Sequence, residues 1–342
     1  MTIDAANPHF GSDNYAGVCP EVLDAFREHG GGHCAAYGDD PLTKRACDAI
    51  RAWFDRDCEV FFVFSGTAAN SLALASICQS YHAIICSPKA HLEEDECNAP
   101  AFFSNGARLL PTNDTEGKVT PAELTRLLRA REGDIHFSKS RVLSITQATE
   151  LGSVYSRDEL RTLCDLAHDA DLMVHMDGAR FVNAVVSLDV HPKEVVEGID
   201  VLSFGGTKMG MPLSEAVVFF NRKLAEDFEY RRKQAGQLAS KMRFLAIPWI
   251  AMLEDDTWRR YARNANARAQ QLAARVRAIP GINIRPVEAN GVFLTMPPAM
   301  VEPLRRLWKF YPSEHVRFMC AWDTTSEDVE ALAADIERLA NG

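Results

Sequence analysis

Seven short apolar runs that alternate with helical patterns constrain the fold of this chain more than any other feature of its sequence. Most of the runs are rich in Val, Ile, Leu and Phe. They cover residues 59–64, 83–86, 107–110, 141–146, 172–176, 200–204 and 216–220. Helical patterns lie between several of them, at 67–81, 121–131 and 158–170. This alternation predicts an α/β sheet with helices on both faces.

The pattern changes near residue 221. Residues 222–277 are charged, rich in Ala, Leu and Arg, and mostly helical by pattern. Short apolar runs at 281–284, 291–296 and 315–321 and a helical pattern at 326–340 follow them. We therefore predict two domains. The large domain covers residues 1–245 and begins with an arm at 1–20, and a smaller α+β domain covers residues 246–342.

Charge and cysteine usage exclude several classes of protein. The 342 residues include 37 basic and 47 acidic side chains, so the chain has no basic stripe for nucleic acid. No apolar stretch approaches the length of a membrane span, and no signal peptide is visible at the amino terminus. The nine cysteines are odd in number and include no C-x-x-C pair, which argues against a disulfide framework and structural zinc. A reducing cytoplasm is the expected location.

Reactive side chains follow four of the predicted strands. In an open α/β sheet, ligands bind beyond the carboxyl ends of the strands. Ser65, Gly66 and Thr67 come directly after the first run and begin a helical pattern. Backbone N–H groups and the helix dipole favour an anion at such a position. The alternative is a plain helix cap, which any Ser or Thr can provide.

His91 lies a few residues after the run at 83–86, within an acidic stretch that ends at Glu96. Its imidazole could lie over a bound aromatic ring. Asp95, four residues later, allows a metal site, but no second histidine stands nearby at ligand spacing, so we predict no metal. The acidic residues 93–96 are expected to form a solvated face.

Asp177 ends an apolar run, where a carboxylate is costly to bury without a partner. A bound ring nitrogen that must stay protonated would be such a partner. Arg180, three residues later, could bind a carboxylate or a phenolate. The alternative is an Asp cap that pairs with an arginine.

Lys208 follows the run at 200–204 through two glycines and Thr207. A lysine held on tight backbone at this end of a sheet is suited to Schiff-base formation, although most lysines are surface cations. Phosphate turn, histidine, aspartate and lysine also occur in the order used by fold type I enzymes of pyridoxal-5′-phosphate (PLP). Asp177 and Lys208 are 31 positions apart, which leaves room for one helix and one strand.

These motifs resemble those of the threonine aldolase family of the β-eliminating lyase group. The resemblance runs across almost the whole chain, and the segment Phe204–Lys208 is similar to that of low-specificity members from bacteria. It is strongest in Ser12–Tyr15, Tyr37–Asp40, Ser65–Asn70, His91, His175–Arg180, Gly206–Lys208 and Val316–Phe318. The resemblance implies a fold type I enzyme with a seven-stranded mixed sheet and PLP as cofactor.

The resemblance also implies a role for each matching residue. Lys208 forms the Schiff base, Asp177 pairs with the pyridinium nitrogen and His91 stacks on the ring. Ser65, Gly66, Thr67, Arg180 and Thr207 contact the cofactor, and Ser12, Tyr37, Arg180 and Arg317 contact the substrate. The family works as a homotetramer with active sites at a dimer interface. The segments around Tyr37 and around 241–243 are candidates for contact with a neighbouring subunit.

The implied reaction splits L-threonine, L-allo-threonine and related β-hydroxy-α-amino acids, including phenylserine types, into glycine and an aldehyde. The chain departs from the family at two positions. Met209 stands where a small or polar residue is usual, and Glu150 stands where many members have a histidine near the substrate hydroxyl. Glu150 is either the base for that hydroxyl or a structural partner of a cation such as Arg180. Two other readings stay open: another PLP lyase or aminotransferase, and a binding protein without catalysis.

Overall fold

The central sheet confirms the predicted mixed α/β architecture. A computed structural model describes residues 9–130, 132–312 and 315–341. Among these residues seven strands form one sheet in the order β1-β7-β6-β5-β4-β2-β3. The strands are β1 (Glu59–Val63), β2 (His82–Cys86), β3 (Arg108–Pro111), β4 (Lys139–Thr146), β5 (Met173–Gly178), β6 (Val201–Phe204) and β7 (Glu215–Phe219). In this sheet β7 pairs antiparallel with β1 and with β6, and the other pairs are parallel, so the carboxyl ends of β2 to β6 share one edge.

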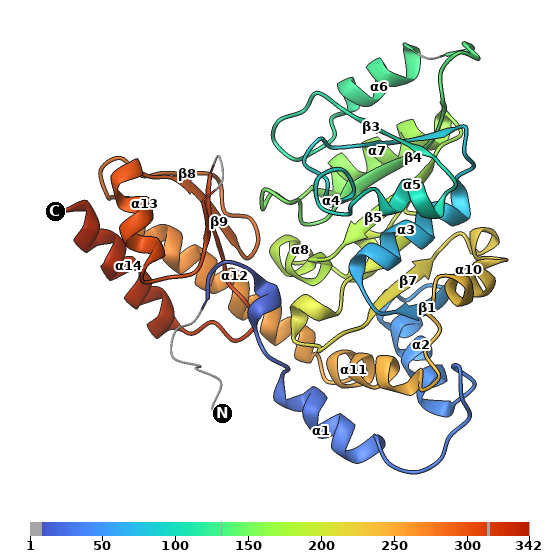
Figure 1. Ribbon diagram of the computed structural model, residues 1–342, viewed down its shortest axis with the longest axis horizontal. Coiled ribbons are helices and arrows are strands. Elements are labelled where there is room, and N and C mark those ends of the chain that lie inside the picture. Colours follow the sequence, from blue (N-terminus) through green and yellow to red (C-terminus); the bar gives the residue numbers. More distant parts are fainter. Residues whose placement is uncertain (1–8, 131, 313–314, 342) are drawn as a thin grey trace.

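Helices cover both faces of this sheet (Figure 1). They include α1 (Pro20–His29), α2 (Pro41–Phe54), α3 (Gly66–Ile77), α4 (His91–Glu94), α5 (Ala99–Phe103), α6 (Pro121–Arg129), α7 (Arg157–Asp169), α8 (Phe181–Leu188), α9 (Pro192–Val195), α10 (Phe228–Gln234) and α11 (Arg243–Leu253). Alternate strand residues enter different cores: Ala216 and Val218 pack on one face of β7, and Val217 and Phe219 on the other. Strands buried on both faces are continuously apolar, which is why the runs are visible in the sequence.

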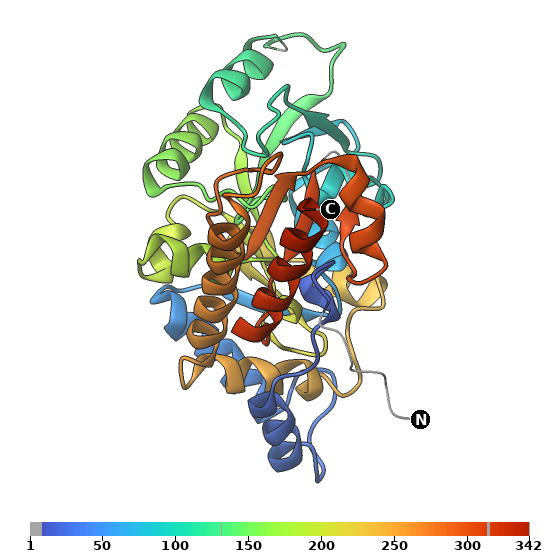
Figure 2. The same cartoon turned by 90° about the vertical axis from the view of Figure 1, so that its left-hand side faces the viewer.

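A smaller α+β unit follows. Its sheet has the order β10-β11-β9-β8, with β8 (Asn283–Ile284), β9 (Gly291–Thr295), β10 (Tyr311–Pro312) and β11 (Val316–Met319). The helices α12 (Thr257–Val276), α13 (Pro298–Arg305) and α14 (Ser326–Ala340) pack on it, and Figure 2 shows α14 beside α12. The final helix matches the predicted range, and the short strand β10 was not predicted. The domain boundary at residue 245 stays a prediction, and that position falls inside α11.

The amino-terminal arm is hydrogen-bonded to the small unit beside its sheet. Phe10 is buried in its hydrophobic core. The Phe10 N–H donates to the carbonyl of Lys309 at 3.0 Å, and the Phe10 carbonyl accepts the N–H of Met319 at 2.8 Å. The arm is therefore fixed to β11 before the chain enters the large sheet.

Within the described residues, no helix combines the length and apolar character needed to span a membrane.

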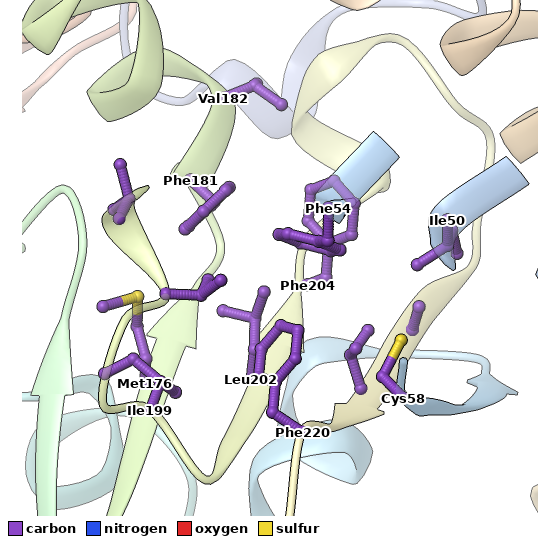
Figure 3. Close-up of a cluster of buried hydrophobic side chains, with 14 of the residues drawn as sticks. Ile50, Phe54, Cys58, Met176, Phe181, Val182, Ile199, Leu202, Phe204 and Phe220 are labelled. Atoms are coloured by element: carbon purple, nitrogen blue, oxygen red, sulfur yellow. The ribbon is translucent and has the colours of Figure 1, made fainter. Parts of the chain in front are cut away.

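An aromatic cluster supports the end of β6. The rings of Phe54, Phe181 and Phe204 lie close to one another in the hydrophobic core (Figure 3). The ring of Phe204 lies 5.6 Å from that of Phe54 and 5.7 Å from that of Phe181, measured between centroids. Phe204 is the last residue of β6, so this packing fixes the backbone from which the next turn begins.

Phe204→Ala should lower the free energy of unfolding by about 3–5 kcal/mol, because it removes a fully buried ring and leaves a cavity. Urea denaturation followed by far-UV circular dichroism measures the loss. Phe102→Ala is the matched control, since Phe102 is 76% exposed. A loss for Phe204→Ala no larger than that of the control would show that the cluster does not support the sheet.

Candidate functional site

A pocket of about 340 Å³ opens at the carboxyl edge of the large sheet. This volume lies within the range of ligand sites in proteins. Parallel pairing sets Thr146 of β4, Asp177 of β5 and Ser203 of β6 side by side at its floor. The residues predicted from the sequence that line it are Ser65, Gly66, Thr67, His91, Glu150, Asp177, Arg180, Thr207 and Lys208.

Lys208 enters the pocket from a tight turn after β6. A Cβ on Gly205 would lie 2.7 Å from the backbone of Ala179, and one on Gly206 would lie 2.3 Å from the carbonyl oxygen of Ser214. Both glycines are therefore required for the turn that carries Lys208. Burial and the charge of Arg180 lower the pKa of the Lys208 amine. An amine with a lowered pKa is more often neutral, and the neutral form is the nucleophile.

Glu215, which the sequence analysis missed, holds the same turn. Its buried carboxylate begins β7 and accepts the N–H of Gly206 and the hydroxyl of Thr207, each at 2.6 Å. Burial raises the pKa of Glu215 to about 6, against the effect of these hydrogen bonds. The Thr207 hydroxyl thus donates to Glu215 and retains only acceptor capacity toward a ligand.

Asp177 is buried at the end of β5 and is held by two donors. Its Oδ1 accepts the N–H of Ala179 at 2.9 Å, and its Oδ2 accepts Nδ2 of Asn70 at 2.8 Å. Neither donor carries a charge, so the carboxylate has no ion-pair partner within the described part of the chain. An Asp placed in this way can stabilise a cationic group of a ligand in the pocket.

His91 begins α4 and its side chain is 41% exposed. Its Nδ1 lies 2.8 Å from Oε1 of Glu96, and the same oxygen accepts Nδ2 of Asn70 at 2.8 Å. The hydrogen bond to Glu96 raises the pKa of His91. The expectation of a solvated acidic face at 93–96 is wrong for Glu96, whose side chain is fully buried, because the chain turns inward after α4.

Glu150 lies beside His91. Its Oε1 accepts the backbone N–H of His91 at 2.8 Å and the hydroxyl of Thr146 at 2.9 Å, while its Oε2 is buried without a hydrogen-bond partner among the described residues. Burial, with the charge of Asp177, raises the pKa of Glu150 to about 7. The structural alternative, an ion pair with Arg180, is not formed.

Arg180 pairs instead with Asp13 from the amino-terminal arm. Its Nε and Nη2 donate to the two Asp13 oxygens at 2.7 and 2.9 Å, and Asn290 also donates to Asp13 at 3.0 Å. Burial opposes ionisation of Asp13, but the charges of Arg180 and Lys208 outweigh it and hold the pKa of Asp13 well below its usual value. Asp13 and Asn290 were not singled out from the sequence.

The helix α3 begins at the pocket with Gly66. The Ser65 hydroxyl accepts the N–H of Ala68 at 3.3 Å, so Ser65 is a helix cap, as the alternative reading had it. A Cβ added at Gly66 would meet nothing within 4 Å, which leaves the backbone of this first turn open toward the pocket. First-turn N–H groups have no partner inside a helix and favour an anion.

Three predicted substrate residues do not line this pocket. Ser12 accepts the N–H of Asn14 at 3.2 Å, which caps a short helical turn. Tyr37 is exposed, and the Lys233 amine lies 4.8 Å from its ring centroid. Arg317 donates to the carbonyl of Gly11 at 3.1 Å and stacks on the ring of Tyr311 at 4.7 Å.

Comparisons of the sequence and of the fold with known proteins agree with each other. The family model described as β-eliminating lyase matches residues 9–298. The chain is similar to a low-specificity L-threonine aldolase of a Pseudomonas species, with 56% identity over 334 residues and 96% of each chain covered. A second such enzyme, from Pseudomonas aeruginosa, is 55% identical over 340 residues, which cover 97% of this chain and 98% of that protein. Among solved structures, threonine aldolase of Leishmania major shares the fold, with a TM-score of 0.92 at 24% identity over 97% of this chain and 100% of that one.

Proposed function

The chain belongs to the β-eliminating lyase family, and we propose on this basis that it is a PLP enzyme that cleaves β-hydroxy-α-amino acids into glycine and an aldehyde. Its two Pseudomonas relatives are low-specificity L-threonine aldolases. L-Threonine and L-allo-threonine are therefore the proposed substrates, and phenylserine-type amino acids are proposed as further ones.

The donor set of the pocket fits this cofactor. The observation that carries the proposal is that the Lys208 amine, with a lowered pKa, enters the same pocket as the buried Asp177 carboxylate, which forms no ion pair with any described residue. An aldehyde, a basic ring nitrogen and a phosphate on one ligand would match the amine, the carboxylate and the open first turn of α3.

Each pocket residue then has a proposed task. Lys208 would hold the cofactor through its amine, and Asp177 would keep the ring nitrogen protonated. His91 would cover the ring with its imidazole. The phosphate would be bound by Gly66 and Thr67, with Ser65 and Thr207 beside it. When bound, the cofactor supplies an electron sink for the bond between the α- and β-carbons of the substrate.

The remaining tasks fall to residues that bind the substrate and move its proton. Arg180, already oriented by Asp13, offers its guanidinium to the substrate carboxylate. Arg317, Ser12 and Tyr37 are proposed to assist it, although they lie outside the pocket of the single chain. Holding the carboxylate orients the bond to be broken, and such orientation contributes to the rate.

Glu150 is the proposed acceptor of the β-hydroxyl proton. Its Oε1 is fixed by two donors, while Oε2 has no hydrogen-bond partner among the described residues. A pKa of about 7 is suited to a base that works near neutral pH. The carboxylate form is needed to accept a proton, so activity should rise as the pH passes through this pKa.

Glu150→Gln should keep substrate binding but lower kcat by roughly a hundredfold, and the acidic limb of the pH–rate profile should vanish. Steady-state glycine release between pH 5 and 9 measures both. Glu93→Gln, an exposed position near the site, is the matched control. If kcat is unchanged, Glu150 is not the base; if KM or stability changes while the acidic limb persists, its role is structural.

A panel of L-threonine, L-allo-threonine and L-phenylserine tests the function as a whole. Glycine and the corresponding aldehyde are the expected products. Formation of a keto acid would indicate an aminotransferase on the same fold, and the absence of any PLP-dependent visible absorbance would indicate a binding protein without catalysis.

We also propose that the enzyme is a homotetramer whose active sites lie at a dimer interface. The exposed Tyr37 and the segment 241–243 are the proposed contacts with the neighbouring subunit. Sedimentation equilibrium tests the number of subunits.

A cytoplasmic location stays a prediction from cysteine usage.

A further inference from the structure

Glu96 is a buried acidic side chain beside the pocket for which the proposed reaction has no task. Its side chain has no exposed surface, and a single oxygen, Oε1, accepts hydrogen bonds from both His91 Nδ1 and Asn70 Nδ2 at 2.8 Å. A carboxylate is costly to bury, so its presence beside the pocket calls for a compensating role.

The amide of Asn70 fixes the orientation of this group. Its Nδ2 donates to Glu96 Oε1 and to Asp177 Oδ2, each at 2.8 Å. Only the NH₂ end of an amide carries two protons, so it must face the two acceptors, and Asn70 separates two carboxylates that would otherwise repel each other. Asn70 is itself 2% exposed, which leaves little freedom to rotate.

The contact with His91 selects one form of the imidazole. Burial raises the pKa of Glu96. When Glu96 is ionised it can only accept hydrogen bonds, so its contact with Nδ1 then places the proton on Nδ1. The neutral ring then has its lone pair on Nε2. We infer that Glu96 is a positioning residue that holds His91 as the Nδ1–H tautomer, with Nε2 as the nitrogen available to the pocket, and that Asn70 ties this arrangement to Asp177.

Other charged groups face His91 and set the conditions of the test. Asp177 favours the imidazolium, Lys208 disfavours it, and the carboxylate of Glu150 accepts the backbone N–H of His91. Glu93, Glu94 and Asp95 on the same segment are exposed. The tautomer is therefore best determined at a pH above the range in which the imidazole ring titrates, because the ring is neutral there.

The experiment measures the ¹⁵N chemical shifts of the histidine ring nitrogens in the full chain, with and without PLP, using His91→Asn to assign the signals. In the wild type Nδ1 should be the protonated nitrogen of neutral His91. Glu96→Gln keeps an acceptor oxygen and should retain this tautomer, but without the charge the imidazole should titrate at lower pH. Glu96→Leu removes the acceptor and should shift the ring to the Nε2–H form that free histidine prefers.

If Glu96 had only a structural role, Glu96→Gln and Glu96→Leu would both affect folding, and the tautomer of His91 would not differ between them. Glu93→Gln is the control and should leave both nitrogen shifts of His91 unchanged. The inference is overturned if neutral wild-type His91 is protonated at Nε2, or if Glu96→Leu leaves the Nδ1–H form in place. These signals are read without substrate, so their failure can be told apart from failure of the proposed aldolase activity.

Discussion

Lys208→Ala should abolish steady glycine release. Among the described residues that line the pocket, Lys208 is the only lysine, so no other amine there can take its place. The methyl group of alanine can neither hold the cofactor covalently nor be exchanged for the substrate amine. Visible absorbance of the protein with PLP, before and after addition of L-threonine, and glycine release in the same samples measure the loss.

Lys44→Ala is the control for this variant, because Lys44 is a surface cation whose side chain is 78% exposed. It should keep both the absorbance and the activity. Lys208→Ala protein that still attaches the cofactor covalently and releases glycine at a near-normal rate would contradict the assignment of the lysine.

Asp177→Asn should leave PLP bound but slow the reaction roughly a hundredfold or more, because a neutral amide cannot stabilise a protonated ring nitrogen. The hydrogen bonds that Asp177 accepts should add to the effect of this substitution. Both Asp177 oxygens accept N–H groups, from Ala179 and from Asn70, so an NH₂ group at either position would face a donor. PLP affinity by fluorescence titration and kcat for L-threonine separate binding from catalysis.

Asp169→Asn is the matched control, since Asp169 lies exposed at the end of α7. It should change neither quantity. A decrease in kcat of less than about tenfold for Asp177→Asn would count against electrostatic stabilisation of the ring nitrogen.

Several strands could be predicted from the sequence because they are buried on both faces, as β2, β6 and β7 are. Such strands are mostly apolar, and short apolar runs are easy to recognise. The final helix was equally clear, because Thr325 and Asp328 form a capping box at its start. The strand β10 has only two residues, Tyr311 and Pro312, and no periodicity can show in so short a segment.

The pocket residues could be predicted for a related reason: the carboxyl ends of parallel strands meet at one edge. The supporting residues could not, since their burial depends on contacts between distant segments. Asp13 meets Arg180 across 167 positions, and Asn70 meets Asp177 across 107. A signal existed for Asn70, which is the one amide side chain in a helix made otherwise of Gly, Thr, Ala, Ser, Leu and Ile and is buried along most of its length.

The attachment of the amino-terminal arm limits how far the two parts of the molecule can separate. Phe10 is hydrogen-bonded to the small unit, and Asp13 is paired with Arg180, which precedes α8 in the large unit. Three residues of extended chain span at most about 10 Å. The arm therefore limits hinge motion between the two parts, because a motion longer than its slack must break either the hydrogen bonds of Phe10 or the ion pair that orients Arg180.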